Sequence, residues 1–238
     1  PLTVVAPHDG RVAGIVTADS PTVAVRVPDH PVMASLLAVC SFPIAAPSAN
    51  LSNYVSPTTA EHVASAFGDQ VRLILDGGAC KCGLESTIIR LGRSSVELLR
   101  PGAISAEQIE SAFGNVVMSL QPEPQSDGDS TAPLASPGQM AKHYSPRTPL
   151  VLVGSRESEH DPASIARITF FPIASDQAGR FGWYRCLSET GDLDEVARKL
   201  YTAVRDADAS GCGLILIDQC QPIGIGRAIM DRIGRAAH

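Results

Sequence analysis

The sequence lacks the long apolar run of a membrane-spanning helix and the dense Lys/Arg runs that grip a phosphate backbone. No uninterrupted apolar stretch reaches the roughly 20 residues that cross a bilayer. The 19 Lys and Arg residues are outnumbered by 25 Asp and Glu residues, which gives a formal net charge of −6. These absences argue against a membrane-spanning helix and against a large nucleic-acid footprint.

Cysteines are few and scattered, at positions 40, 80, 82, 186, 212 and 220. The "CKC" at Cys80–Cys82 is too tight for a zinc knuckle. We interpret the six side chains as reduced thiols in a cytoplasmic protein. No Ser-His-Asp or Cys-His arrangement is legible, so no covalent catalyst is predicted.

What is present is a globular mixture, with 44% hydrophobic and 18% charged residues in 238 positions, enough for one or two domains. Strand and helix patterns alternate in the first half, which predicts a mixed α/β domain. Strands are expected at 2–7, 22–28, 42–48, 71–78, 85–92 and 95–102, and helices at 30–41, 56–68 and 105–114. Either Ser56 or Thr58 is the expected cap of the middle helix, which Gly68 closes.

Residues 118–146 are rich in Pro, Ser, Asp and Gly, so we interpret them as a linker. Beyond the linker, strands are expected at 148–154, 166–173 and 212–219, with helices at 192–211 and 224–238. This strand–helix–strand alternation predicts a small Rossmann-like parallel α/β domain at 147–238.

Several motifs, in order along nearly the whole chain, resemble the L-threonylcarbamoyladenylate synthases in their long form. They are "TVAVRVPDHP", "APSANLSNYVSPTTAEHV", "ILDGGACKCGLESTII", "LLRPGAIS", "SPGQMAKHYSP" and "GIGRAIMDRIGRAA". These enzymes make threonylcarbamoyl-AMP from L-threonine, bicarbonate or CO2, and ATP, and release pyrophosphate. A partner complex then transfers the threonylcarbamoyl group to tRNA.

The resemblance implies an α/β fold in three parts. Residues 1–117 would be the C-terminal part of a twisted-sheet, YrdC-like catalytic domain, followed by a linker and active-site lid at 118–146 and the Rossmann-like domain. Family members also carry an earlier Thr- and Tyr-Gly-containing stretch and a Lys-Arg-Pro loop, neither of which is in this sequence. We therefore expect a partial catalytic domain and no activity from this chain alone. Asn53 stands where the family usually has Gly, and Asn tolerates the positive φ of such a turn.

The chemistry of the family asks mainly for positioning. The threonine amine attacks CO2, and the resulting carbamate oxygen attacks the α-phosphate of ATP. The site must hold a carboxylate, a carbamate and a triphosphate together, which calls for cations, hydroxyl and amide donors, and magnesium. The resemblance implies ATP as a substrate and magnesium whose ligands the sequence does not identify.

By the same resemblance, threonine binding falls to Arg26, Ala46 and Ser86. The Arg26 fork suits a carboxylate bidentately, and its alternative is a surface salt bridge. Ala46 would contribute its backbone to the pocket.

ATP binding is assigned to Thr22, Ser48, Asn50, Ser56 and Arg100. Ser48 and Asn50 would donate to nucleotide oxygens at a strand end, and Ser56 would combine a nucleotide contact with a helix cap. Arg100 is the cation expected at the phosphates, and its alternative is an ordinary strand-end arginine. Thr22 is alternatively a plain β-branched strand residue.

Gln139, His143 and Tyr144 end the linker. In the family this segment folds over the active-site mouth, where a lid would protect the labile adenylate from water. The alternative is a linker that simply packs against a domain.

Three functions compete. The leading one is a cytoplasmic nucleotidyltransferase of tRNA modification, which hands its product to the tRNA threonylcarbamoyl-transfer complex and binds little tRNA itself. The second is a truncated, non-catalytic ATP- or RNA-binding remnant, although the acidic balance argues against RNA. The third is a carbamoyl-transfer module of the hydrogenase-maturation kind, against which the linker and the C-terminal domain argue.

Overall fold

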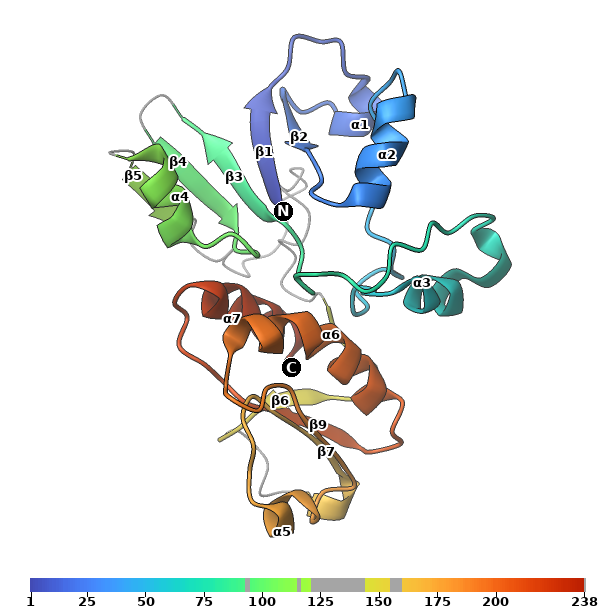
Figure 1. The fold of residues 1–238 in the computed structure, drawn as a ribbon, viewed down its shortest axis with the longest axis vertical. Coiled ribbons are helices and arrows are strands. Elements are labelled where there is room, and N and C mark those ends of the chain that lie inside the picture. Colours follow the sequence, from blue (N-terminus) through green and yellow to red (C-terminus); the bar gives the residue numbers. More distant parts are fainter. Residues whose placement is uncertain (93–94, 115–116, 121–143, 155–159, 238) are drawn as a thin grey trace. The chain divides into compact units, whose positions relative to one another are not determined.

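The computed structural model describes residues 1–92, 95–114, 117–120, 144–154 and 160–237. Contacts between residues divide the chain into two units. Figure 1 shows the chain coloured by position in the sequence. Unit 1 comprises Pro1–Pro47 and Glu85–Ala141, and unit 2 comprises Ser48–Leu84 and Lys142–His238. The stretch from Ser48 to Leu84 therefore packs with the C-terminal residues, although it lies in the sequence segment that resembles the catalytic domain.

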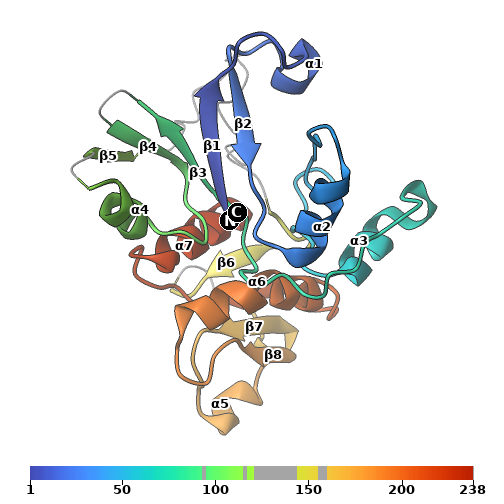
Figure 2. The same ribbon diagram turned by 45° about the horizontal axis from the view of Figure 1, so that its top comes forward.

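Unit 1 is built on a mixed sheet with the strand order β2-β1-β3-β4-β5 (Figure 2). Its strands are β1 (Leu2–Pro7), β2 (Thr22–Arg26), β3 (Thr87–Leu91), β4 (Ser95–Arg100) and β5 (Val117–Leu120). Pairs β1–β2 and β3–β4 are antiparallel, and pairs β1–β3 and β4–β5 are parallel. The predicted mixed α/β architecture is confirmed, and β5 occupies residues that composition alone assigned to the linker.

Helix α4 (Ala106–Phe113) supplies most of the helical packing in unit 1. Ser105 and Gln108 close a capping box at its start, which fixes where the helix begins. Ala106 and Ile109 then bury their side chains against the sheet residues Ile89, Val96 and Leu98. Helices α1 (Gly14–Thr17) and α2 (Pro31–Val39) bury no side chain.

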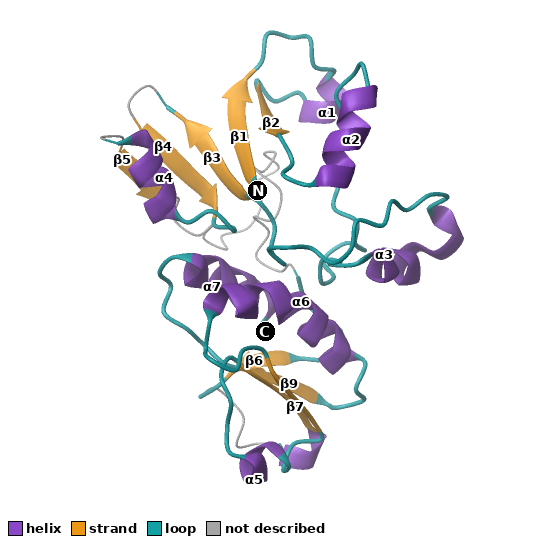
Figure 3. Cartoon of the chain, viewed as in Figure 1, coloured by secondary structure: helices purple, strands orange, loops and turns teal. Residues whose placement is uncertain are grey.

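Unit 2 has a fully parallel sheet in the order β6-β9-β7-β8, which confirms the Rossmann-like prediction. The strands are β6 (Leu150–Leu152), β7 (Ile165–Thr169), β8 (Trp183–Cys186) and β9 (Leu214–Ile217). Helices α6 (Leu193–Asp208) and α7 (Ile225–Ala236) lie against one face of this sheet, as the secondary-structure colouring of Figure 3 shows. The shorter helices are α3 (Ala60–Phe67) and α5 (Ser175–Ala178).

The stripe of apolar residues along α6 explains how unit 2 holds together. The Asp192 carboxylate caps the helix, and Val196, Leu200 and Val204 are buried along its inner face. They belong to one cluster with sheet residues Ile168 and Ile217 and with Val55 from the earlier stretch. The cluster ties that stretch to the C-terminal fold.

Two predicted strands and one predicted cap are wrong. Residues 42–48 and 71–78 form no strand, and their apolar side chains are not buried, since Phe42 and Leu73 are 64% and 75% exposed. Without a partner strand or a covered face, a β-prone run stays irregular. Helix α3 is capped by Thr59, whose hydroxyl accepts from the His62 amide, rather than by Ser56 or Thr58.

The helices within the described ranges are all too short or too polar to cross a membrane.

Candidate functional site

Strand register in unit 1 places three polar residues in a row. Arg26 ends β2 and lies directly opposite Thr3 of β1. The Thr3 hydroxyl hydrogen-bonds the Ser86 hydroxyl at 2.7 Å, and both side chains are buried. Directly opposite residues in an antiparallel pair share one face of the sheet. Arg26 and Ser86, the two side chains predicted to bind threonine, are therefore linked through Thr3.

Arg100 at the end of β4 reaches the same serine. Its Nε and Nη2 donate to the Ser86 carbonyl at 3.2 and 2.9 Å, and Nη2 also lies 3.2 Å from the Ser86 hydroxyl. Arg100, which was predicted to bind ATP, thus uses some of its hydrogen-bond donors to position Ser86, which was predicted to bind threonine. A cation beside a serine hydroxyl is a suitable setting for an anionic ligand.

The backbone beneath this row is held tightly. The Thr87 hydroxyl donates to the Ile104 carbonyl at 2.6 Å and accepts from the Ile104 amide at 3.0 Å. Gly102 lies so close that a Cβ there would come within 2.3 Å of the Thr87 nitrogen. Only glycine allows the two backbones to come this close. The close contact holds the "RPG" turn and the "EST" turn in position against each other.

Arg26 itself is exposed, and no ion pair joins it to a described residue. The surface salt bridge that was its alternative reading is therefore absent from the described part of the chain. Thr22 begins β2 and is half-buried, with its hydroxyl 3.0 Å from that of Ser20. Ala46 is exposed in the irregular stretch that replaces the predicted strand.

The remaining predicted ATP ligands lie in unit 2, on the turn before α3. Ser48 is exposed, whereas Asn50 and Ser56 are buried, at 8% and 9% exposure. The Asn50 Nδ2 donates to the carbonyls of Leu51 and Tyr54, both at 2.9 Å, so these amide donors are used within the turn. Asn53 adopts φ 63°, which confirms the positive φ expected for asparagine in this turn.

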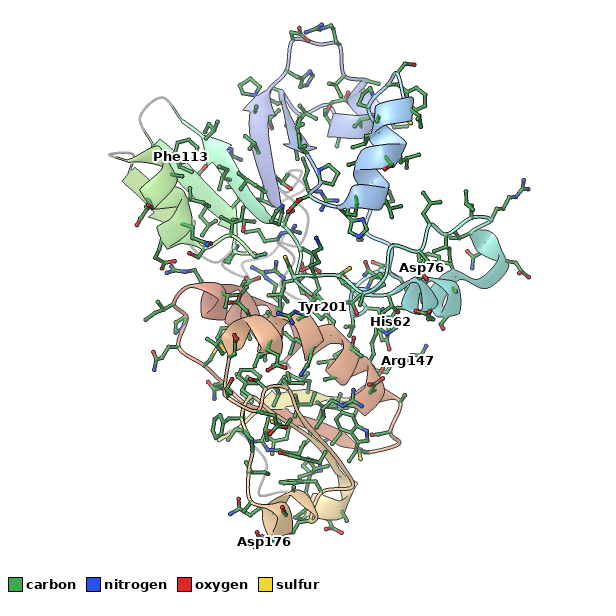
Figure 4. All side chains as sticks on the ribbon, in the orientation of Figure 1. His62, Asp76, Phe113, Arg147, Asp176 and Tyr201 are labelled. Carbon is green, nitrogen blue, oxygen red and sulfur yellow. The ribbon has the colours of Figure 1, made fainter. Side chains whose placement is uncertain are left out.

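Helix α6 and the residues before β6 surround this turn. The Tyr54 hydroxyl donates to the Asp208 carboxylate at 2.8 Å, and the Arg205 guanidinium lies over the Tyr54 ring at 4.9 Å. Burial and the hydrogen bond to Asp208 raise the pKa of Tyr54. Burial lowers the pKa of the Arg205 guanidinium. Figure 4 labels two neighbours of the turn, His62 on α3 and Arg147 before β6.

The predicted lid is only partly described. Gln139 and His143 lie outside the described residues. Tyr144 is 2% exposed in unit 2, with its ring 5.7 Å from that of Tyr201 and the Arg232 guanidinium 5.2 Å above it. Its lid role stays a prediction, and in the described structure the side chain anchors the end of the linker to the C-terminal fold.

Sequence reasoning missed Thr3, Tyr54, Arg205 and Asp208. Thr3 carries a signal in hindsight, since it is a polar residue in an otherwise apolar strand end. The other three are ordinary by sequence and gain their position only from long-range packing. Among the described residues, no group of three or more His, Cys, Asp or Glu side chains is placed to hold a metal ion.

Two family models match the chain. One, described as "Telomere recombination" and covering the Sua5, YciO and YrdC proteins, matches residues 1–102. The other, described as "Threonylcarbamoyl-AMP synthase, C-terminal domain", matches residues 104–238. Together they define the class as a YrdC-type α/β domain joined to a synthase C-terminal domain.

Curated relatives agree with the models. Threonylcarbamoyl-AMP synthase of Pyrococcus abyssi is 34% identical over all of this chain and 70% of the relative. The Bacillus subtilis enzyme of that name is 36% identical over 93% of this chain and 65% of the relative. The Schizosaccharomyces pombe enzyme of that name is 34% identical over 99% of this chain and 62% of the relative. The chain belongs to the threonylcarbamoyl-AMP synthase family, and it spans 62–70% of the length of these relatives.

Solved structures give the same result. The crystal structure of P. abyssi Sua5 complexed with L-threonine matches with a TM-score of 0.84 at 32% identity, over 99% of this chain and 70% of that one. A variant of the same protein, in which a neighbouring histidine and tyrosine are both alanine, matches with a TM-score of 0.82 at 31% identity, over 99% and 69%.

Proposed function

We propose that this chain supplies threonine- and nucleotide-binding groups of an enzyme that makes L-threonylcarbamoyl-AMP and pyrophosphate from L-threonine, bicarbonate or CO2, and ATP. The observation that carries the proposal is the full-chain match to synthases of that name, together with the fold shared with a protein solved with L-threonine. The polar row of unit 1, which consists of Arg26, Thr3 and Ser86, supplies a cation and hydroxyl groups that suit the binding of an amino acid.

In this proposal Arg26 holds the threonine carboxylate, because its fork is exposed and has no ion pair within the described ranges. Ser86 presents its hydroxyl to threonine and is oriented by Thr3 and Arg100. Ala46 lends backbone to the same amino acid. The amine then attacks CO2, and the protein contributes positioning and charge neutralisation rather than a covalent catalyst.

The nucleotide is proposed to contact Thr22, Ser48, Asn50, Ser56 and Arg100. Magnesium is proposed to arrive with the triphosphate, and no step is assigned to a resident ion. Gln139, His143 and Tyr144 would close over the adenylate, and the solved variant at a histidine–tyrosine pair of the P. abyssi protein makes the pair at His143–Tyr144 a natural target.

The cellular setting is also a proposal. All six cysteines are free, which fits a reducing cytoplasm. The product is a reactive mixed anhydride, so an acceptor enzyme that carries tRNA would consume it. The excess of acidic residues supports little direct tRNA binding by this chain.

A pyrophosphate-release assay with ATP, bicarbonate and L-threonine tests the proposal, on this chain and on any longer form of the protein. Threonine-dependent release from at least one form is the expected result for the family, and the absence of release from every form would contradict the proposal. ATP binding without threonine-dependent release from any form would instead favour the non-catalytic ATP-binding remnant.

Replacing Arg26 with alanine is the sharpest single test of the threonine site. In the active form, Arg26→Ala should raise the KM for threonine by about tenfold or more, because a charge-assisted bidentate contact is lost. The KM for ATP should change little. Arg11→Ala is the matched control, since Arg11 is an exposed arginine of the same unit that pairs with Asp9. An unchanged threonine KM in Arg26→Ala would remove Arg26 from the site.

A further inference from the structure

Side chains of helix α6 contact the turn at residues 51–57, and the proposed function assigns these side chains no role. We infer that Arg205 and Asp208 are positioning residues that fix this turn, which carries the proposed ATP contact Ser56, to the segment Tyr144–Thr148 at the end of the linker. The identity of the ligand, ATP, rests on the proposed function. We call Arg205, Asp208 and Tyr54 the α6 clamp.

Arg205 acts on the backbone of the turn. Its Nη2 donates to the Val55 carbonyl, its Nε donates to the Ser56 carbonyl at 3.4 Å, and its guanidinium covers the Tyr54 ring. One side chain thus meets three consecutive residues. Such a contact fixes the direction of the Ser56 backbone, and therefore of the Ser56 side chain proposed to meet the nucleotide.

Asp208 joins the turn to the linker end. One carboxylate oxygen accepts from the Tyr54 hydroxyl at 2.8 Å, and the other accepts from the Thr148 amide at 2.7 Å. These hydrogen bonds outweigh the effect of burial and lower the pKa of Asp208, so the carboxylate stays charged near neutral pH. The same carboxylate therefore holds two segments that are far apart in sequence.

The surrounding contacts make the linkage a network. The Ser145 amide donates to the Asn53 carbonyl at 2.9 Å, which connects the linker end to the turn directly. Tyr144 stacks on Tyr201, one helical turn before Arg205 on α6. Val55 is fully buried in the same cluster as Tyr144 and Tyr201. A shift of the linker end would therefore displace Val55 and Ser56.

Other residues of α6 provide the comparison that separates positioning from simple stabilisation. Asp206, which lies between Arg205 and Asp208 in the sequence, pairs instead with Arg185 of β8 at 2.5 Å. Arg198 donates to the Lys81 carbonyl at 3.2 Å, at the far end of the same early stretch. These contacts stabilise unit 2 without holding residues 51–57.

The experiment uses Arg205→Met and Asp208→Ala, with Arg205→Lys and Asp208→Asn as conservative partners and Arg185→Met as the matched control. Hydrogen exchange on the chain as it exists, without ligand, is measured for the backbone amides of residues 51–58, apart from Pro57, which has no N–H. Each disruptive variant should exchange about tenfold faster there, since a hydrogen-bonded charge is lost. Arg185→Met should leave these amides at wild-type rates.

The second readout concerns ATP. In the form active in pyrophosphate release, the disruptive variants should raise the KM for ATP by about tenfold and change the KM for threonine by less than about twofold. Asp208→Asn should restore most of the ATP KM, because its amide oxygen still accepts from Thr148 and its NH2 still pairs with Tyr54. Calorimetric ATP titration gives the same comparison if no form turns over.

The outcomes separate the inference from the proposed function. Unchanged exchange at 51–58 in both disruptive variants overturns the α6 clamp, whatever the activity. Faster exchange with wild-type ATP affinity reduces the clamp to a structural contact and also overturns it. Wild-type protein that binds no ATP refutes the proposed function, and faster exchange would then still support a positioning role toward the turn itself.

Discussion

Units 1 and 2 have similar α/β ingredients but very different interiors. Unit 2 joins its sheet, α6 and α7 in one large buried cluster and has a smaller one around Leu214, whereas unit 1 has only small clusters around Ile89 and Ile88 among its described residues. Large apolar side chains of unit 1 are exposed, with Ile15 at 94% and Val27 at 83%. Because buried apolar area is the main source of stability, unit 2 carries most of the stability of the described structure. Unit 1 carries the polar row proposed for threonine.

Core truncation should expose this difference with the largest effect. Ile217→Ala, at a fully buried position of β9, should lower the free energy of unfolding of unit 2 by about 3–4 kcal/mol. Val27→Ala, at an exposed position, should change it by less than about 0.5 kcal/mol. Urea titration followed by fluorescence measures both, because the single tryptophan, Trp183, lies on β8 of unit 2. Equal effects would remove the contrast between the units.

The sequence predicted the elements best where pattern and burial agree. The period of α6, the capped start of α4 and the parallel strands of unit 2 all follow from local residues. The runs at 42–48 and 71–78 failed because β propensity counts only when a partner strand and a covered face exist, and neither surrounds Phe42 or Leu73. β8 was missed because "WYRC" alternates too briefly to register.

The candidate site divides in the same way. The motifs named Arg26, Ser86 and Arg100 through family resemblance, and the structure adds that Ser86 bonds both Thr3 and Arg100. The place of Thr3 in the site required strand register, because a polar residue in an apolar strand does not by itself identify its partner. Arg205 and Asp208 lie about 150 residues beyond the turn they hold, and one sequence without related sequences carries no sign of such pairing.

Removing the Thr3 hydroxyl sharpens the comparison from the side of unit 1. Thr3→Val keeps the shape but leaves the buried Ser86 hydroxyl without this partner, so Ser86 turns more freely. The KM for threonine should rise by about fivefold to tenfold, while the urea midpoint reported by Trp183 should stay at the wild-type value. Thr17→Val, on α1 of the same unit, is the control and should affect neither. A shifted Trp183 midpoint would show that unit 1 contributes to the stability of unit 2.

The smallest effect concerns the pH dependence of unit 2. Burial and the nearby positive charge of Arg205 lower the pKa of His62, whose Nδ1 accepts from the Thr58 amide and therefore favours the neutral ring. Below the ordinary histidine pKa of about 6.5 the unfolded chain binds a proton that the folded chain resists, so stability should fall as the pH drops from about 7.5 to 5.5.

His62→Asn, which keeps an acceptor near Nδ1 but does not titrate, should flatten this slope. His160→Asn at an exposed position should leave the slope unchanged. Urea unfolding followed at Trp183 across the pH range measures it. An identical slope in wild type and His62→Asn would mean that the ring is protonated as easily in the folded protein as in the unfolded chain. The carboxylates of Asp206 and Glu61, which raise the pKa of His62, would then offset the effects of burial and of Arg205.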